Sequence, residues 1–232
     1  MTNATPAAHE PADPTSVARA EAARYALLRR LAPSMRHHLV VNLQPIGMIY
    51  EVMDRRLRAA QPDLASVHES AHKINGFARA ALASCLDVVT WLAPDQSAGT
   101  PVADGVRECL SLLATSLGFR GYAIRNEVTA LPGEVSRASL RYVLTSALIY
   151  STDQSPPPAE LVLTGSSEAS GLRLALALRP AEGGQGFAHE AAYRKLDWGD
   201  VKALAEAESV AVERDGQTLK MLIPWTGSHR PA

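Results

Sequence analysis

The fold is decided by the stretch SMRHHLVVNLQPI, residues 34–46, in which His37 and His38 stand side by side inside a long helical pattern. Imidazole titrates near neutral pH and can act as a nucleophile, a base or a metal ligand. Around this stretch apolar residues recur at spacings of three, four and once seven, typical of one side of an amphipathic helix: Tyr25, Leu28, Leu31, Met35, Leu39, Ile46, Ile49, Met53 and Leu57. Because proline removes a backbone donor, we expect Pro33 to separate a short leading helix and Pro45 to kink the main one.

A second helix is predicted after a turn at residues 61–63. Ser66 and Glu69 have the spacing of a capping box near its start. Its apolar stripe covers nearly four heptads: Val67, Ala71, Ile74, Ala78, Ala81, Cys85, Val89 and Leu92. Two long helices joined so tightly must lie antiparallel, and a lone hairpin cannot bury such a stripe, whereas two hairpins from two chains form a four-helix bundle. The sequence therefore predicts a helical hairpin at 15–94 that forms a homodimer.

Beyond a predicted linker at 95–101 the pattern becomes mixed. Ser136 is a predicted helix cap, and Asp215-Gly216 is the two-residue signal of a tight hairpin. The predicted elements are helices at 102–117, 137–148 and 197–208 and strands at 122–129, 160–164, 172–178, 209–213 and 218–224. This order predicts an α+β protein whose second domain, at 102–226, packs helices on one face of a mixed sheet. Residues 1–14 and 227–232 are expected to be tails.

Composition limits the classes of function. The 232 residues include 47% hydrophobic and 20% charged residues, which is ordinary for a soluble globular protein. With 23 basic and 24 acidic residues the formal net charge is −1, so no overall field favours nucleic acid or an anionic membrane. Cys85 and Cys109 lie in apolar patterns and indicate neither a disulfide framework nor a zinc site. The first residues lack a signal peptide, and the longest apolar run, 80–93, is too short to span a bilayer; we expect a cytoplasmic protein.

Residues 37–44, HHLVVNLQ, resemble the phosphoacceptor box His-Arg-Val-Lys-Asn-Asn-Leu-Gln of one subfamily of sensor histidine kinases. The resemblance extends over about residues 25–225, and it implies a dimerisation and phosphotransfer hairpin followed by an ATPase-like α/β sandwich. It makes His37 the phosphoacceptor, with Asn42 among the matching residues that follow. Neutral imidazole is a competent nucleophile, and the Arg36 guanidinium can pair with phosphoryl oxygens. His38 stands where many such boxes carry an acidic residue, and it is the second candidate acceptor.

The ATPase-like half departs from the kinase pattern. Kinases of this type hold magnesium and phosphate with asparagines in a pattern like Val-Leu-x-Asn-Leu-Leu-x-Asn-Ala, and here the two asparagine positions hold Ser146 and Tyr150. A tyrosine cannot ligate a hard cation as an amide oxygen does, and its bulk would intrude on a phosphate site. The segment 182–186, EGGQG, supplies the glycines of an Asp-x-Gly-x-Gly motif without its aspartate. We therefore expect a degenerate domain that has lost ATP binding and uses no cofactor.

Three functions follow from the resemblance. The first is a histidine phosphotransferase that passes phosphoryl groups between response regulator receiver domains through His37. The second is a non-catalytic pseudokinase adaptor that binds a receiver or a kinase, and the third is an active ATP-dependent kinase. The expected partners are a receiver domain and a second copy of the chain, without nucleic acid or membrane. His68 and His72 have a spacing that can bind a metal on one helix face, but no third ligand is nearby in the sequence, so a solvated face is expected.

Overall fold

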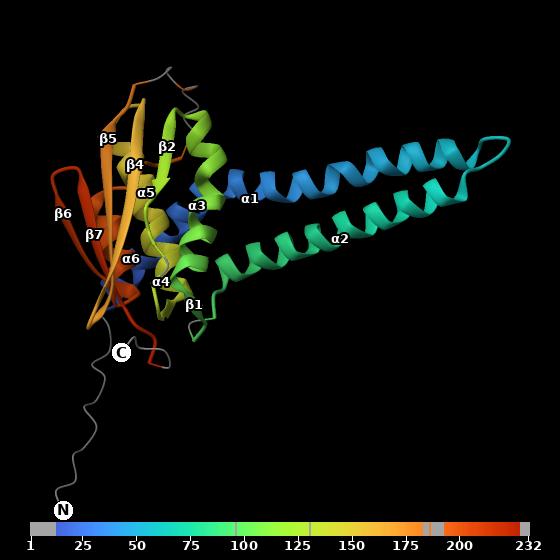
Figure 1. Ribbon diagram of the computed structural model, residues 1–232. Coiled ribbons are helices and arrows are strands. Elements are labelled where there is room, and N and C mark those ends of the chain that lie inside the picture. The colour runs from blue at the N-terminus through green and yellow to red at the C-terminus, as the bar shows by residue number, and fades with distance from the viewer. Residues whose placement is uncertain (1–12, 96, 130, 183–185, 187–192, 228–232) are drawn as a thin grey trace, which may run out of the picture.

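The computed structural model describes residues 13–95, 97–129, 131–182, 186 and 193–227. Its most conspicuous feature is a pair of long antiparallel helices, α1 (Pro14–Leu57) and α2 (Leu64–Leu92), that project from an α/β domain (Figure 1). The predicted antiparallel hairpin is thus confirmed. None of the described helices is long and apolar enough to cross a bilayer.

Helix α1 is one continuous helix of 44 residues, about 66 Å long at 1.5 Å per residue. Asp13 caps it by accepting a hydrogen bond from the Thr15 amide (3.1 Å), and Pro14 occupies the first turn, where no amide is needed. The expectation that Pro33 separates a leading helix was wrong, because the helix runs through both Pro33 and Pro45. Tertiary packing along most of its length offsets the cost of two missing backbone donors.

The N-terminus of α2 also differs from its prediction. The helix begins at Leu64, and its cap is Asp63, whose carboxylate accepts from the amides of Ala65 (3.1 Å) and Ser66 (3.2 Å). The predicted capping box of Ser66 and Glu69 was therefore wrong, because an acidic residue stands one position before the helix and satisfies the free amides first. The Glu69 carboxylate pairs instead with Lys73 on its own helix, at 2.6 Å.

The α/β domain contains a five-stranded mixed sheet in the order β2-β4-β5-β7-β6. Strands β2 (Tyr122–Asn126) and β4 (Ala159–Glu168) are parallel; β5 (Gly171–Pro180), β7 (Thr218–Pro224) and β6 (Ala211–Asp215) continue antiparallel. Leu161 and Leu163 of β4 are fully buried together with Val162 between them, whereas in β5 the fully buried Leu172, Leu174 and Leu176 alternate with more exposed residues. The predicted hairpin at Asp215-Gly216 is confirmed, with Asp215 paired to Thr218 and Gly216 at φ +58°.

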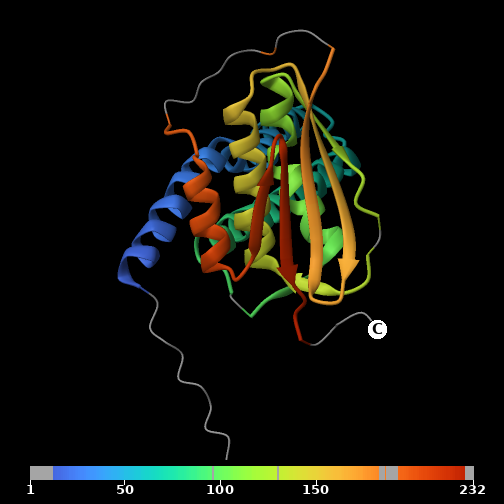
Figure 2. The same cartoon turned by 90° about the vertical axis from the view of Figure 1, so that its left-hand side faces the viewer.

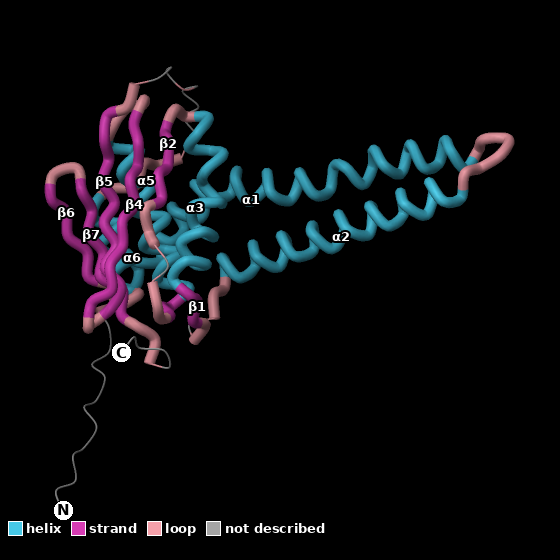
Figure 3. Tube along the Cα trace, viewed as in Figure 1, coloured by secondary structure: helices cyan, strands magenta, loops and turns pink. Residues whose placement is uncertain are grey.

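Helices cover one face of this sheet, as the sequence predicts (Figures 1 and 2). They are α3 (Val102–Phe119), α6 (Trp198–Ala207), and a continuous helix made of α4 (Arg137–Ser139), a π-helical segment η1 (Leu140–Leu144) and α5 (Thr145–Gln154). Ser136 caps this last helix, as predicted, by accepting from the Ser139 amide (3.2 Å). Figure 3 shows the division between the helical and stranded layers.

The expected linker at 95–101 is partly structured. Its last three residues form β1 (Gly99–Pro101), which pairs antiparallel with β3 (Glu134–Ser136) in a small second sheet. Short strands of this kind carry no alternating apolar pattern, so the composition of the segment suggested only a loop. The predicted N-terminal tail lies almost wholly outside the described residues.

Candidate functional site

The histidine pair lies where α1 leaves the α/β domain. Met35 is the last residue of α1 that is buried in the core, and His37 follows it by two positions. The His37 side chain is exposed and that of His38 is half-buried, with the two rings tilted by 53° and their centroids 6.3 Å apart. Within the described residues the His37 imidazole makes no hydrogen bond or ion pair. An incoming group can therefore reach its ring nitrogens.

Arg36 and Asn42 have different surroundings. Arg36 is exposed, and its guanidinium has no carboxylate partner in the described part of the chain. The Asn42 side-chain amide donates to the His38 carbonyl oxygen (3.0 Å) and to the Ser84 hydroxyl of α2 (3.2 Å). Asn42 thus fastens α1 to α2 one turn beyond the histidines, on the side of the helix that His38 faces. The structure brings Arg36 and His37 together on the exposed side and leaves Asn42 in the helix–helix contact.

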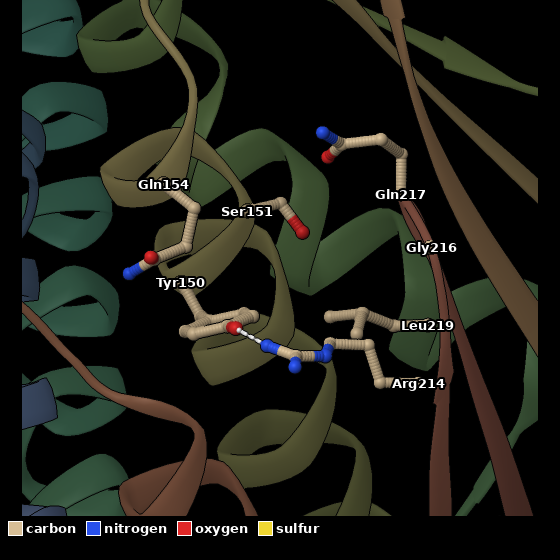
Figure 4. A pocket seen from close by; sticks show the side chains of 7 residues that line it. All are labelled: Tyr150, Ser151, Gln154, Arg214, Gly216, Gln217 and Leu219. Carbon is tan, nitrogen blue, oxygen red and sulfur yellow. Dashed lines mark hydrogen bonds between the residues drawn. The ribbon is translucent and has the colours of Figure 1, made fainter.

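Ser146 and Tyr150, which the sequence resemblance aligns with the two kinase asparagines, are both buried in the helix that covers the sheet. The Ser146 hydroxyl donates to the Val143 carbonyl oxygen of its own helix (2.9 Å), so it faces no open space. The Tyr150 hydroxyl accepts a hydrogen bond from Arg214 of β6, at 2.7 Å (Figure 4). The Tyr150 ring lies 5.8 Å from that of Trp198. Tyr150 therefore ties α5 to the β6–β7 hairpin and to the start of α6.

A small cavity remains between α5 and the β6–β7 hairpin (Figure 4). Its volume is about 140 Å³, and it is lined by Tyr150, Ser151, Gln154, Arg214, Gly216, Gln217 and Leu219. Pockets for drug-sized ligands and cofactors usually measure ~300–1,000 Å³. None of the described residues that line this cavity is acidic, so these residues offer no carboxylate to a magnesium ion. Of the lid-like segment 182–186, residues 183–185 lie outside the described residues.

The remaining histidines of the hairpin, His68 and His72, are both exposed on α2. No group of three or more histidine, cysteine, aspartate or glutamate side chains gathers anywhere in the described residues.

One buried arginine has no counterpart among the residues predicted from the sequence. Arg141 of η1 is 2% exposed and contacts residues of both α2 and α3. In the sequence it stands among apolar helix residues without a partner at helical spacing, so no local pattern marked it. Likewise, the Tyr150–Arg214 contact joins positions 64 residues apart, which periodicity cannot pair.

Comparisons with known proteins give the following. No family model matches the chain, and no curated protein is significantly similar to it. The catalytic domain of histidine kinase ThkA aligns with 55% of this chain and 95% of its own, at 9% identity and a TM-score of 0.42. A histidine kinase from Burkholderia phymatum covers 92% of this chain and 98% of its own, at 14% identity and a TM-score of 0.42. A bacterial phosphotransferase covers 84% and 95%, at 11% identity and a TM-score of 0.39. At these values the alignments assign no function, which has to come from the residues of this chain.

Proposed function

We propose that this protein is a histidine phosphotransferase of a two-component phosphorelay, with His37 as the group that accepts and donates phosphoryl. The observation that carries the proposal is the His37 imidazole, exposed and without a partner in the described residues, on a helix whose flanking segments are packed. A nucleophile needs both an accessible lone pair and a fixed position. The local resemblance to a kinase phosphoacceptor box adds support from the sequence.

The proposed phosphoryl transfer needs no cofactor bound to this chain. A ring nitrogen of neutral His37 attacks the phosphorus of a phosphoaspartate on a receiver domain. The N–P bond forms as the P–O bond to the aspartate breaks, and the carboxylate leaves with the electron pair. The reverse step passes the phosphoryl group to a second receiver. Arg36, exposed beside His37, is placed to pair with the phosphoryl oxygens.

The surroundings of Tyr150 support a relay over a kinase. A nucleotide site requires an open pocket and oxygen ligands for magnesium. At the two positions where kinases carry asparagine, Ser146 bonds within its helix and Tyr150 bonds to Arg214. We therefore propose that ATP binding has been lost. Calorimetric titration with ATP and magnesium is expected to show no binding, and a micromolar dissociation constant would restore the active kinase as a candidate.

A second copy of the chain is the proposed partner of the hairpin. Twelve large apolar side chains of its two helices beyond His38 are exposed: Val40, Val41, Leu43, Met48, Tyr50, Val52, Leu57, Leu64, Leu82, Leu86, Val89 and Leu92. An isolated monomer rarely exposes so large an apolar surface, and association of two hairpins in a four-helix bundle covers it. Such a bundle also holds His37 more rigidly than one hairpin can.

The decisive experiment is phosphoryl transfer from radiolabelled, phosphorylated receiver domains. The wild-type protein is expected to acquire an acid-labile label, and His37→Ala is expected to acquire none. His72→Ala removes an equally exposed histidine from α2 and is expected to label normally. Label that persists in His37→Ala and disappears in His38→Ala would move the acceptor by one residue.

The adaptor remains the second candidate, because an exposed histidine next to an apolar hairpin surface also suits a binding protein. It predicts that receivers or kinases bind the chain without labelling it. Failure of every receiver tested to label the wild-type protein, combined with receiver binding that survives in His37→Ala, would favour the adaptor.

A further inference from the structure

The first half of α1 is built into the α/β domain. Five of its residues, spaced by three or four, are buried there in the common core: Ala20, Ala23, Leu27, Leu31 and Met35. Ala23, Leu27 and Leu31 have no exposed surface. Helix α1 packs closely against α6, and the two lie side by side in Figure 2. The helix that carries His37 is therefore also a helix of the α/β domain.

Two ion pairs reinforce this packing. The Arg30 guanidinium meets the Asp153 carboxylate in a bidentate contact, with both N···O distances at 2.7 Å, and the two side chains are 11% and 2% exposed. Arg24 pairs with Glu208 at 3.1 Å and lies over the ring of Tyr142. Separating a buried pair of this kind leaves an uncompensated charge in the protein interior, which is strongly unfavourable.

Helix α2 is held from the opposite side by Arg141. The guanidinium donates to Asp87 (2.6 Å) and to the Thr90 hydroxyl (2.8 Å) of α2, and to Glu108 of α3 (2.6 Å). It also lies over the ring of Trp91, at 4.7 Å from the centroid. One residue later, the Tyr142 hydroxyl donates to the Trp91 carbonyl oxygen (2.8 Å). The end of α2 is thus bonded to η1 of the α/β domain, and Arg141 ties η1 in turn to α3.

We propose that these contacts make the hairpin and the α/β domain one rigid body, in which His37 keeps a fixed position relative to the sheet and its helices. We name the Arg24 and Arg30 contacts the α1 clamp and the Arg141 contacts the α2 clamp. A domain that delivers a phosphoryl group to a histidine on its own hairpin has to swing about its connection to that hairpin. In this protein such a rotation of the α/β domain would break both clamps and expose the buried apolar residues of α1 between Ala20 and Met35. The inference stands on these contacts alone and does not depend on the proposed transfer reaction.

Distance measurements between two spin labels test the rigid body. One label is placed on His72→Cys, an exposed polar position of α2, and the other on Thr164→Cys, an exposed position of β4, in a Cys85→Ser background; Cys109 is buried and remains unlabelled. Dilution with a tenfold excess of unlabelled Cys85→Ser protein restricts the signal to pairs within one chain. We expect a single narrow distance distribution. A broad distribution, or two populations, would overturn the proposal.

Clamp variants show whether the named contacts are responsible. Arg30→Met combined with Arg141→Met is expected to broaden the distribution while circular dichroism retains the helical content. Arg107→Met removes an exposed ion pair on α3, with Asp104, and is expected to leave the distribution narrow. Should the double variant fail to fold, Asp87→Asn is the milder test, because it weakens the ion pair between Arg141 and the half-exposed Asp87 and leaves Arg30 in place. It is expected to broaden the distribution less than the double variant would. A distribution that stays narrow in a folded double variant would refute the clamps as its cause.

Discussion

Glu208 is a carboxylate buried at the end of α6, with its side chain 4% exposed. Burial raises the pKa of Glu208, and the nearby charge and hydrogen bond of Arg24 offset this only in part. A carboxyl group whose pKa is higher in the folded state stabilises the fold below its unfolded pKa, near 4.3, and that contribution is lost as the pH rises through the folded pKa.

Glu208→Gln is therefore expected to gain stability relative to the wild type as the pH increases. At pH 4 the protonated glutamate and the glutamine are alike, whereas at pH 7 the wild type has to bury a carboxylate whose cost the Arg24 pair offsets only in part. Urea denaturation of both proteins at the two pH values measures the difference in free energy of unfolding. A difference that does not change with pH would show that Glu208 is not protonated more readily in the folded state.

The Tyr150 hydroxyl contributes one hydrogen bond, to Arg214, beside the small cavity between α5 and the β6–β7 hairpin. Tyr150→Phe keeps the ring beside Trp198 and is expected to lower the free energy of unfolding by ~1 kcal/mol, the usual contribution of one such bond. Tyr50→Phe, at an exposed position of α1, is the matched control and is expected to change nothing measurable. An equal loss of stability in both variants would show that the hydrogen bond to Arg214 is not what stabilises the fold at Tyr150.

At the scale of elements, Pro33 lies on the exposed side of α1 inside an unbroken helix. Pro33→Ala supplies the missing amide to the carbonyl group one turn earlier and removes a steric conflict, and we expect it to raise the free energy of unfolding by ~1–2 kcal/mol. Thermal unfolding followed by circular dichroism measures this. Destabilisation instead would mean that the packing of residues 20–35 depends on the proline ring itself.

Leu82, Leu86 and Val89 form an exposed row on α2, at spacings of four and three. In the proposed bundle, Leu82→Glu combined with Leu86→Glu puts charges into the contact between copies, and it is expected to convert a dimer of 24.8 kDa chains into monomers. Sedimentation equilibrium gives the mass directly. Val17→Glu, on the first half of α1, is the control that is expected to leave the mass unchanged.

Elements with a strong local signal could be predicted from the sequence. The hairpin helices, the Ser136 cap and the Asp215-Gly216 turn each follow from a pattern within a few residues. The continuity of α1 through Pro33 and the pairing of β1 with β3 depend on contacts with distant segments, which no local pattern contains. The same division holds for the site: the His37 helix was predicted, whereas the Arg141 and Arg214 contacts join residues from separate elements.

For the whole molecule, the clamped α/β domain becomes part of the surroundings of His37. Arg30 and His37 are seven residues apart and so share one face of α1. Arg30 points at Asp153, which also lies 3.7 Å from Arg120 at the end of α3. The residue before Arg120 is Phe119, whose side chain is 67% exposed. The face of α1 that Arg30 shares with His37 therefore meets Asp153 and Arg120, and Arg120 directly follows the exposed Phe119.

A protein interface usually covers about 800 Å² on each partner, so a receiver that reaches His37 is expected to touch Phe119 as well. Phe119→Asp is therefore expected to slow phosphoryl transfer from the receiver about tenfold, equivalent to ~1.4 kcal/mol of lost binding, without changing thermal stability. Val17→Asp, another exposed apolar residue of the α/β side, is expected to leave the rate unchanged. Rapid-quench measurements with a labelled receiver distinguish the two. An unaltered rate in Phe119→Asp would show that the receiver does not touch this end of the α/β domain and would confine the docking surface to the hairpin.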